Sequence, residues 1–313
     1  MPDKTILAKP LVRSEASILS PLRYPGAKRR LSGYIAEVLR VNDLRPKIFT
    51  EPFAGGASVA LQLLQDNLVD TIALGEVDPL IASFWKIVFN EPEWLIDQIE
   101  NIPVTLEMWS YYKEGRFRTN RDRALACLFL NRTSFSGILA QTAGPLGGYK
   151  QESPYPIDCR FPVSTIRKRI LQAAALRERV LFVRRGDWSE TIAKIEDFGY
   201  ATGEVFYYLD PPFYSKADKL YRFFFDDAGH DALHQALVKI EQPWLLSYDT
   251  ADQILKLYSH NGAGPKRIDH LYSIAASDRL QNVEELIITN LPNLPEETRL
   301  WRSSEEWGRG QTS

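Results

Sequence analysis

The chain has 313 residues, 44% of them hydrophobic and 25% charged, which is enough to build one large α/β domain with an insertion, or two domains. Its two cysteines, Cys127 and Cys159, lie far apart without a histidine at metal-binding spacing, so no disulfide framework, zinc site or other metal is expected, and a reducing cytoplasm is favoured. No apolar stretch reaches membrane-helix length and the first twenty residues lack a signal-peptide core, which predicts no membrane partner.

Helical and extended patterns alternate along most of the chain. Near the start, Leu31, Ile35, Val38 and Leu39 fall on one face of an expected helix. Helices are expected at 27–41, 58–64, 79–89, 106–115, 121–132, 163–176, 188–197 and 231–240. Strands are expected at 47–51, 70–76, 179–185, 204–210, 243–249, 266–274 and 284–291, the last two as an antiparallel pair.

This alternation predicts the fold class and the domains. Strands that alternate with helices favour an α/β fold with a doubly wound, mostly parallel sheet. The alternation stops at about residue 101, and residues 133–162 form a long segment rich in Gly and Pro, so an inserted, mainly helical lobe is expected at 101–162. The catalytic domain would then comprise 20–100 and 163–291, between a flexible arm at 1–19 and a tail at 292–313.

The stretch "FYYLDPPFYS" (206–215) places an acid and two prolines at the end of an apolar run. A continuous apolar run is typical of a buried parallel strand, so Asp210 would lie where the strand leaves the sheet, which is where open α/β sheets bind ligands. Pro211 and Pro212 cannot continue a hydrogen-bonded ladder and stiffen the corner. Phe213 adds a flat face that can stack on a planar ring.

A second turn, in "FTEPFAGGAS" (49–58), indicates a nucleotide-like ligand. Gly55 and Gly56 allow a close backbone approach, but neither a phosphate-binding P-loop nor the spaced-glycine dinucleotide motif is present. Glu76 ends the next strand, where a carboxylate can accept hydrogen bonds from the two hydroxyls of a ribose. A nucleoside without phosphates fits these features, and S-adenosylmethionine is such a ligand.

Several motifs, in this order, resemble those of Dam-type DNA adenine-N6 methyltransferases, and the resemblance covers most of the chain. They are "LRYPGAKRRL" (22–31), "FTEPFAGGAS" (49–58), "ALGEV" (73–77), "LFLNRTSFSGI" (128–138), "RRGDWSETI" (184–192), "YLDPPF" (208–213), "LLSYDT" (245–250) and "VEELIITN" (283–290). The family implies a Rossmann-like methyltransferase sheet, S-adenosylmethionine as cofactor and double-stranded DNA as substrate. Phe213 stands where tyrosine is usual, Ala27 replaces a common glycine, and the likeness fades past Gly137.

The resemblance also implies roles for individual residues. Cofactor contacts are expected from Tyr24, Lys28, Pro52, Phe53, Gly55, Gly56, Glu76, Asp187 and Asp210. Catalysis is expected from Asp210, Pro211, Pro212 and Phe213, with Asp210 and the Pro211 carbonyl accepting the two N6 hydrogens of a flipped-out adenine that stacks on Phe213.

Charge is distributed unevenly, although the net charge is only −2. Residues 101–190 hold 15 Lys and Arg against 8 Asp and Glu, a balance of +7, which leaves −9 for the remainder. This excess indicates nucleic acid binding by the lobe. DNA contacts are expected from Arg116, Arg118, Arg121, Arg123, Asn131 and Arg132.

Three alternatives stay open on the sequence alone: cytosine-N4 methylation, a non-catalytic cofactor- and DNA-binding module of the same fold, and an RNA substrate. Asp rather than Ser before the prolines, together with the motif order, favours adenine. A cognate restriction enzyme is a further expected partner, and the cytoplasm, with the nucleoid in a bacterial host, is the expected location.

Overall fold

A computed structural model describes residues 20–23, 29–215, 217–259, 266–273 and 280–296. The predicted arm, 1–19, and most of the predicted tail lie outside these residues. The strands are β1 (Ile48–Glu51), β2 (Thr71–Glu76), β3 (Val180–Arg185), β4 (Val205–Leu209), β5 (Trp244–Asp249), β6 (Lys266–Ser273) and β7 (Leu280–Thr289). The helices are α1 (Arg29–Val41), α2 (Ser58–Gln65), α3 (Pro79–Asn90), α4 (Pro92–Asn101), α5 (Leu106–Glu114), α6 (Asn120–Thr133), η1 (Phe135–Gly137), α7 (Val163–Ala174), η2 (Arg177–Arg179), α8 (Trp188–Glu196), α9 (Ala217–Leu220), α10 (Asp227–Leu237) and α11 (Asp252–Leu257).

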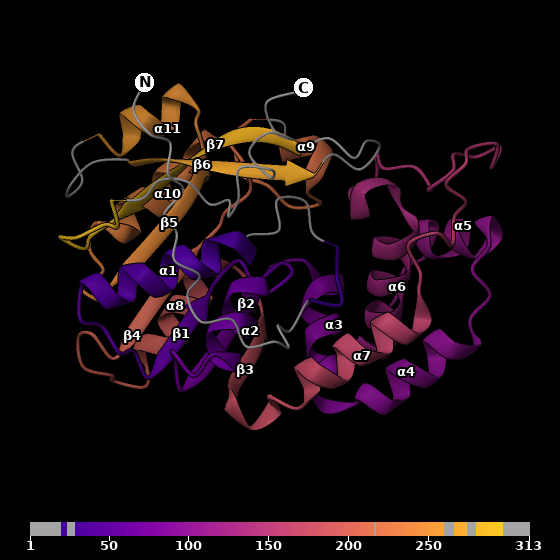
Figure 1. Cartoon of the computed structure of the whole chain (residues 1–313), viewed down its shortest axis with the longest axis horizontal. Helices are drawn as coiled ribbons and strands as arrows, with labels where there is room; N and C mark the ends of the chain where they lie inside the picture. The colour runs from indigo at the N-terminus through magenta and orange to yellow at the C-terminus, as the bar shows by residue number, and fades with distance from the viewer. Residues whose placement is uncertain (1–19, 24–28, 216, 260–265, 274–279, 297–313) are drawn as a thin grey trace, which may run out of the picture.

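The seven strands form one sheet in the order β3-β2-β1-β4-β5-β7-β6 (Figure 1). The pairs from β3 to β5 are parallel, whereas β7 pairs antiparallel with both β5 and β6. The chain order reverses direction between β1 and β4, and this switch point is where open α/β sheets bind ligands. The expected α/β sheet and its closing antiparallel pair are therefore confirmed.

Both faces of the sheet are buried, because successive strand residues point to opposite sides. Phe206 and Tyr208 of β4 pack into a core with α1, α2 and α3, whereas Val205, Tyr207 and Leu209 pack into a second core with α8, α10 and α11. The predicted apolar face of α1 is likewise fully buried. Doubly wound packing thus explains the continuous apolar run at 205–209.

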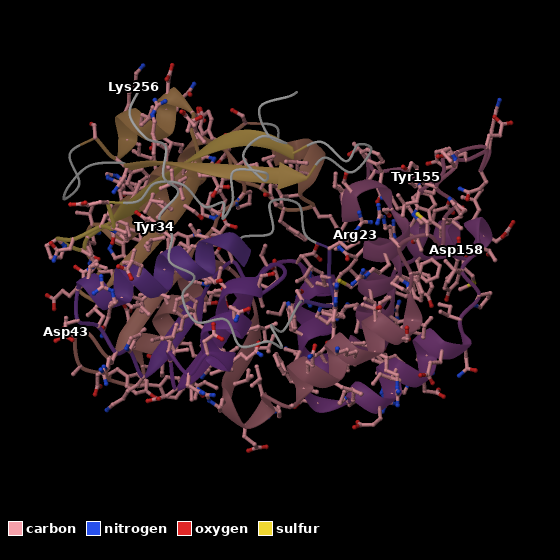
Figure 2. The ribbon with its side chains drawn as sticks, in the orientation of Figure 1. Arg23, Tyr34, Asp43, Tyr155, Asp158 and Lys256 are labelled. Carbon is pink, nitrogen blue, oxygen red and sulfur yellow. The ribbon has the colours of Figure 1, made fainter. Side chains whose placement is uncertain are left out.

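A helical lobe composed of α4, α5, α6 and α7 lies to one side of the sheet, next to α3 (Figure 1). α6 and α7 both pack on α3, and α7 also packs on α4. The helical layer thus continues through 163–174, which the sequence patterns had assigned to the catalytic domain. Figure 2 shows Tyr155 on this lobe, at the far end of the molecule from Lys256 of α11. In the described part of the chain, no helix is long and apolar enough to cross a membrane.

Candidate active site

Acidic side chains follow the carboxyl ends of four adjacent parallel strands. Glu51 ends β1, Glu76 ends β2, Asp187 follows β3 and Asp210 follows β4. All four line one cavity of about 440 Å³ at the switch point of the sheet. Parallel strands bring their carboxyl ends to the same edge, so residues up to 159 positions apart meet because of the topology.

All of the predicted cofactor residues that the structure describes line this cavity. They are Pro52, Phe53, Gly55, Gly56, Glu76, Asp187 and Asp210, together with Pro212 from the predicted catalytic set. Pro211 and Phe213 are not among the lining residues of the cavity. Phe213 packs edge-on against Tyr221, which does line the cavity, with 5.9 Å between the ring centres. Tyr24 and Lys28 lie outside the described residues.

The turn after β1 has the tight backbone that its glycines predicted. Gly55 has φ 46° and Ala57 has φ 47°, both in the left-handed region. The Gly55 N–H donates to Glu76 Oε2 at 2.9 Å, and the Gly55 carbonyl accepts from the Trp85 indole N–H at 2.8 Å. The turn is therefore fixed from both sides before any ligand binds.

Glu76 shapes this turn as well as lining the cavity. In addition to the Gly55 N–H, Glu76 accepts the Asp78 backbone N–H, through Oε1 at 2.9 Å. Only 7% of Glu76 is exposed. Burial, reinforced by the neighbouring Asp78 charge, raises the pKa of Glu76 to about 7. Each carboxylate oxygen has two acceptor sites, so these bonds leave Glu76 able to accept hydroxyl groups.

Glu51 is a cavity residue that the sequence reasoning missed. It is 3% exposed, and its Oε1 accepts the Ala60 backbone N–H at 2.8 Å. Burial, with a smaller contribution from the Asp210 charge, raises the pKa of Glu51 to about 8 against the opposing effect of the Ala60 N–H. Its position at the end of a buried strand, directly before the glycine turn, is the signal that could have identified it.

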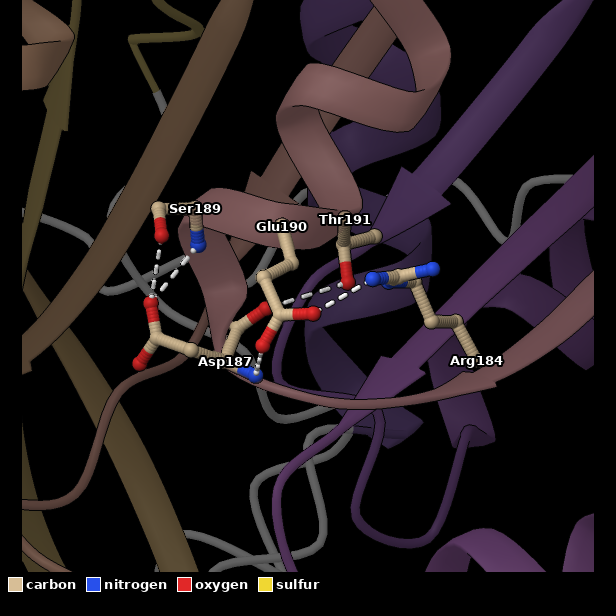
Figure 3. A network of polar contacts seen from close by, with 5 residues as sticks. All are labelled: Arg184, Asp187, Ser189, Glu190 and Thr191. Carbon is tan, nitrogen blue, oxygen red and sulfur yellow. Dashed lines mark hydrogen bonds and ion pairs between the residues drawn. The ribbon is translucent and has the colours of Figure 1, made fainter.

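Asp187 caps α8 at the edge of the cavity (Figure 3). Its Oδ1 accepts the Ser189 N–H at 2.9 Å, and Glu190 reaches back to the Asp187 N–H at 3.2 Å, which completes a capping box. Arg184 pairs with Glu190 in the same network. This capping network fixes the backbone on both sides of Asp187, so that the loop after β3 borders the cavity.

Asp210 is anchored by the neighbouring strand. Its Oδ1 accepts the Ser247 hydroxyl of β5 at 2.8 Å, and the Tyr208 hydroxyl lies 3.0 Å from the same Ser247 oxygen. Ser247 is fully buried. The carboxylate therefore has a defined orientation at the end of β4, as a hydrogen-bond acceptor in catalysis requires.

An aromatic segment at 220–225 forms another wall that the motifs did not predict. Phe223 and Phe224 line the cavity while remaining 40% and 53% exposed. Phe225 packs edge-on against Phe53 of the glycine turn at 5.8 Å. Arg222 donates to Asp78 at 2.7 Å, which joins this segment to the end of β2. Three adjacent phenylalanines after the proline corner were the available signal.

Four of the arginines predicted to contact DNA lie at the surface of the lobe or close to it. Arg116 and Arg118 are exposed in the turn between α5 and α6. Arg121 is exposed but pairs with Glu91 and lies 5.3 Å from the Trp94 ring, and the Arg123 Nε–H donates to a backbone carbonyl at 3.1 Å. Of the four, Arg116 and Arg118 are the exposed ones for which the described residues show no such contact.

The other two residues predicted to contact DNA, Asn131 and Arg132, are buried in the structure. Asn131 is 1% exposed and pairs with the Arg23 backbone, accepting its N–H and donating to its carbonyl, both at 2.6 Å. Arg132 is 4% exposed and donates to the Pro21 carbonyl. Burial, helped by nearby positive charges, lowers the pKa of Arg132. In this structure both residues hold segment 20–23 against α6. Both residues follow the apolar run of α6 directly, and this position was the sequence signal that they would be buried.

Comparisons with known proteins agree with this geometry. A family model described as D12 class N6 adenine-specific DNA methyltransferase matches residues 24–274. A protein from Methanocaldococcus jannaschii named "Type II methyltransferase M.MjaIII" is 24% identical over 213 residues, which cover 61% of this chain and 68% of the relative. The family description favours adenine over cytosine as the base. The family match covers most of the chain, which therefore belongs to the D12 class of N6 adenine-specific DNA methyltransferases.

Proposed function

We propose that the cavity binds S-adenosylmethionine and that Asp210 and the Pro211 carbonyl hold the amino group of an adenine flipped out of double-stranded DNA. The family implies a methyl donor and a DNA substrate. The identity of the donor, the flipped base and the residue roles are parts of the proposal. The relative is named a type II methyltransferase, and we further propose a modification role of that type for this chain, with a cognate restriction enzyme as partner and the cytoplasm as location.

The charge of the cavity is the observation that supports this cofactor. Five carboxyl groups line it, those of Glu51, Glu76, Asp78, Asp187 and Asp210, whereas Arg222 is the basic residue among its lining residues. Burial keeps Glu51 protonated near pH 7, but the other carboxyl groups still outnumber Arg222, so the lining disfavours phosphates and favours a ligand that carries a sulfonium and an amino group. A volume of about 440 Å³ lies within the range of small-molecule sites.

The chemical problem is that the exocyclic amine of adenine is a weak nucleophile, because its lone pair is delocalised into the ring. Asp210 and the Pro211 carbonyl would accept the two amino hydrogens and draw the nitrogen toward tetrahedral geometry. The amine nitrogen would bond to the methyl carbon of bound S-adenosylmethionine as the carbon–sulfur bond breaks, which leaves S-adenosylhomocysteine, and the nitrogen would then release one proton to solvent. Phe213, with the exposed rings of Phe223 and Phe224, offers aromatic faces for a base that has left the duplex.

Asp210→Asn tests the catalytic assignment, since asparagine keeps the size of the side chain but replaces one acceptor oxygen with a donor. We expect the rate of tritium transfer from methyl-labelled S-adenosylmethionine to duplex DNA to fall by about 10²–10³-fold. Asp197→Asn makes the same change at an exposed position at the end of α8 and is the control.

Two measurements complete the test. Methylated DNA is digested to nucleosides, and N6-methyl-2′-deoxyadenosine is the expected modified nucleoside. Affinity for the cofactor analogue sinefungin, measured by calorimetry, shows whether the cavity binds this class of ligand. Asp210→Asn with a rate within about tenfold of wild type would remove Asp210 from the mechanism, and absence of sinefungin binding to the wild type would remove the proposed cofactor.

A further inference from the structure

The proline corner after β4 has few backbone means of holding its position. Pro211 and Pro212 carry no N–H, so neither can donate to a neighbouring strand. The pairing of β4 with β5 extends to Leu209 and Leu246. Beyond that pair, side chains of β5, and no longer its backbone, hold the segment that follows β4.

The first of these side chains is Ser247, which holds the acid of the corner. Its hydroxyl donates to Asp210 Oδ1 at 2.8 Å and lies 3.0 Å from the Tyr208 hydroxyl. Tyr208 and Ser247 are buried, and Asp210 is half-buried. This hydrogen bond restricts the rotation of the carboxylate, because the fully buried Ser247 hydroxyl is held in a fixed position.

The second side chain is Asp249, which holds the chain on the other side of the prolines. Its Oδ1 accepts the Tyr214 N–H at 2.9 Å, and its Oδ2 accepts the Ser215 N–H at 3.0 Å. One carboxylate therefore binds two successive backbone amides just after the corner. Bonds to an ionised acceptor are stronger than those between neutral groups, so this is a firm anchor.

The two anchors work together because of the strand period. Ser247 and Asp249 are two residues apart on β5 and so project to the same side of the strand. Tyr248, between them, projects to the opposite side, where its hydroxyl lies 2.6 Å from His230 Nδ1. The end of β5 thus presents a serine and an aspartate to the two ends of the same corner.

We propose that Ser247 and Asp249 are positioning residues for methyl transfer, which fix the segment from Asp210 to Ser215 at both ends. The inference rests on the catalytic role proposed for Asp210 and goes beyond it by identifying what sets the geometry of that residue. Their loss lowers the rate of the chemical step, because acceptors that are misplaced by about 1 Å cost up to 10²-fold in rate. It lowers the rate far more than it lowers cofactor affinity, because neither Ser247 nor Asp249 lines the cavity, although Asp210, which Ser247 holds, does.

Single-turnover methyl transfer is measured with wild type, Ser247→Ala, Asp249→Asn, the double variant and the control Asp252→Asn. Asparagine at 249 presents an NH₂ donor to one of the two backbone N–H donors, so it breaks half of the anchor. Asp252 is an exposed acid in the first turn of α11 and undergoes the same chemical change. Sinefungin affinity and thermal unfolding are recorded for each protein.

Each single variant is expected to lose about tenfold or more in rate while sinefungin affinity stays within about twofold, and Asp252→Asn to match wild type. The double variant is expected to lose less than the product of the two single losses, because both changes release one corner. A loss below tenfold in either folded single variant, or a matching loss of sinefungin affinity, overturns the proposal. If Asp249→Asn fails to fold, Ser247→Ala decides. A wild type that transfers no methyl group refutes the proposed function instead.

Discussion

Glu51 gives a stability prediction whose sign and size follow from its burial. The carboxyl is 3% exposed, and burial raises its pKa from 4.5 to about 8. The folded protein therefore keeps this proton up to about pH 8, whereas the unfolded chain loses it near pH 4.5. Between these values the folded state binds more protons than the unfolded state, so the contribution of Glu51 to stability is present at low pH and is lost as pH rises.

The magnitude follows from the linkage relation. Each pH unit in this window costs about 1.4 kcal/mol of unfolding free energy, and the cost levels off as pH passes the folded pKa. From pH 6 to pH 8 the loss is about 2 kcal/mol. Glu51→Gln imitates the protonated carboxyl, keeps an oxygen for the Ala60 N–H and does not titrate. The variant should therefore gain about 2 kcal/mol relative to wild type over this range.

The assay is urea denaturation of the cofactor-free protein, followed by the fluorescence of its 7 tryptophans at pH 6, 7 and 8. Comparing variant with wild type at each pH cancels the titration of other groups. Glu178→Gln removes an exposed glutamate from η2 and should differ from wild type by no more than about 0.5 kcal/mol. A difference between Glu51→Gln and wild type that is constant with pH, within about 0.5 kcal/mol, would refute the reasoning.

Three further predictions concern packing and cofactor binding. Gly75→Ala should destabilise the fold by about 1–3 kcal/mol in the same assay, because its Cβ would lie 2.1 Å from the hydroxyl oxygen of buried Thr191; an unchanged midpoint would contradict this. Asn131→Ala should cost about 1–3 kcal/mol, since it leaves the Arg23 backbone without its partner, and a cost below 0.5 kcal/mol would argue against that anchor. Burial raises the pKa of Glu76 to about 7, so sinefungin affinity of the wild type should fall about tenfold from pH 8 to pH 6 as the carboxylate is protonated. The affinity of Glu76→Gln should change less over the same range. Parallel pH profiles of the two proteins would exclude Glu76 as the titrating group.

Local sequence patterns predicted the scaffold of the site well, because their physical causes are local. A continuous apolar run marked β4 as buried on both faces, and the acid and prolines after it marked the end of the strand. The glycine turn at 55–56 and the acid that ends β2 followed from the same logic. The helix expected at 79–89 is α3, which begins at Pro79 in its first turn. The short helix α4, which begins at Pro92 after a break at Glu91, was not predicted.

What the sequence alone could not decide depends on contacts between distant parts of the chain. Asn131 and Arg132 have the composition of a DNA-binding pair, yet Asn131 pairs with Arg23 across 108 positions and is buried. Arg222 meets Asp78 across 144 positions and brings an aromatic wall to the cavity. The raised pKa of Glu51 likewise depends on removal from water, which no local pattern measures. Local sequence therefore determined where the strands end and which acidic side chains stand there. The tertiary packing of the sheet and lobe decided which side chains are buried, and burial in turn sets their charge state and their access to a ligand.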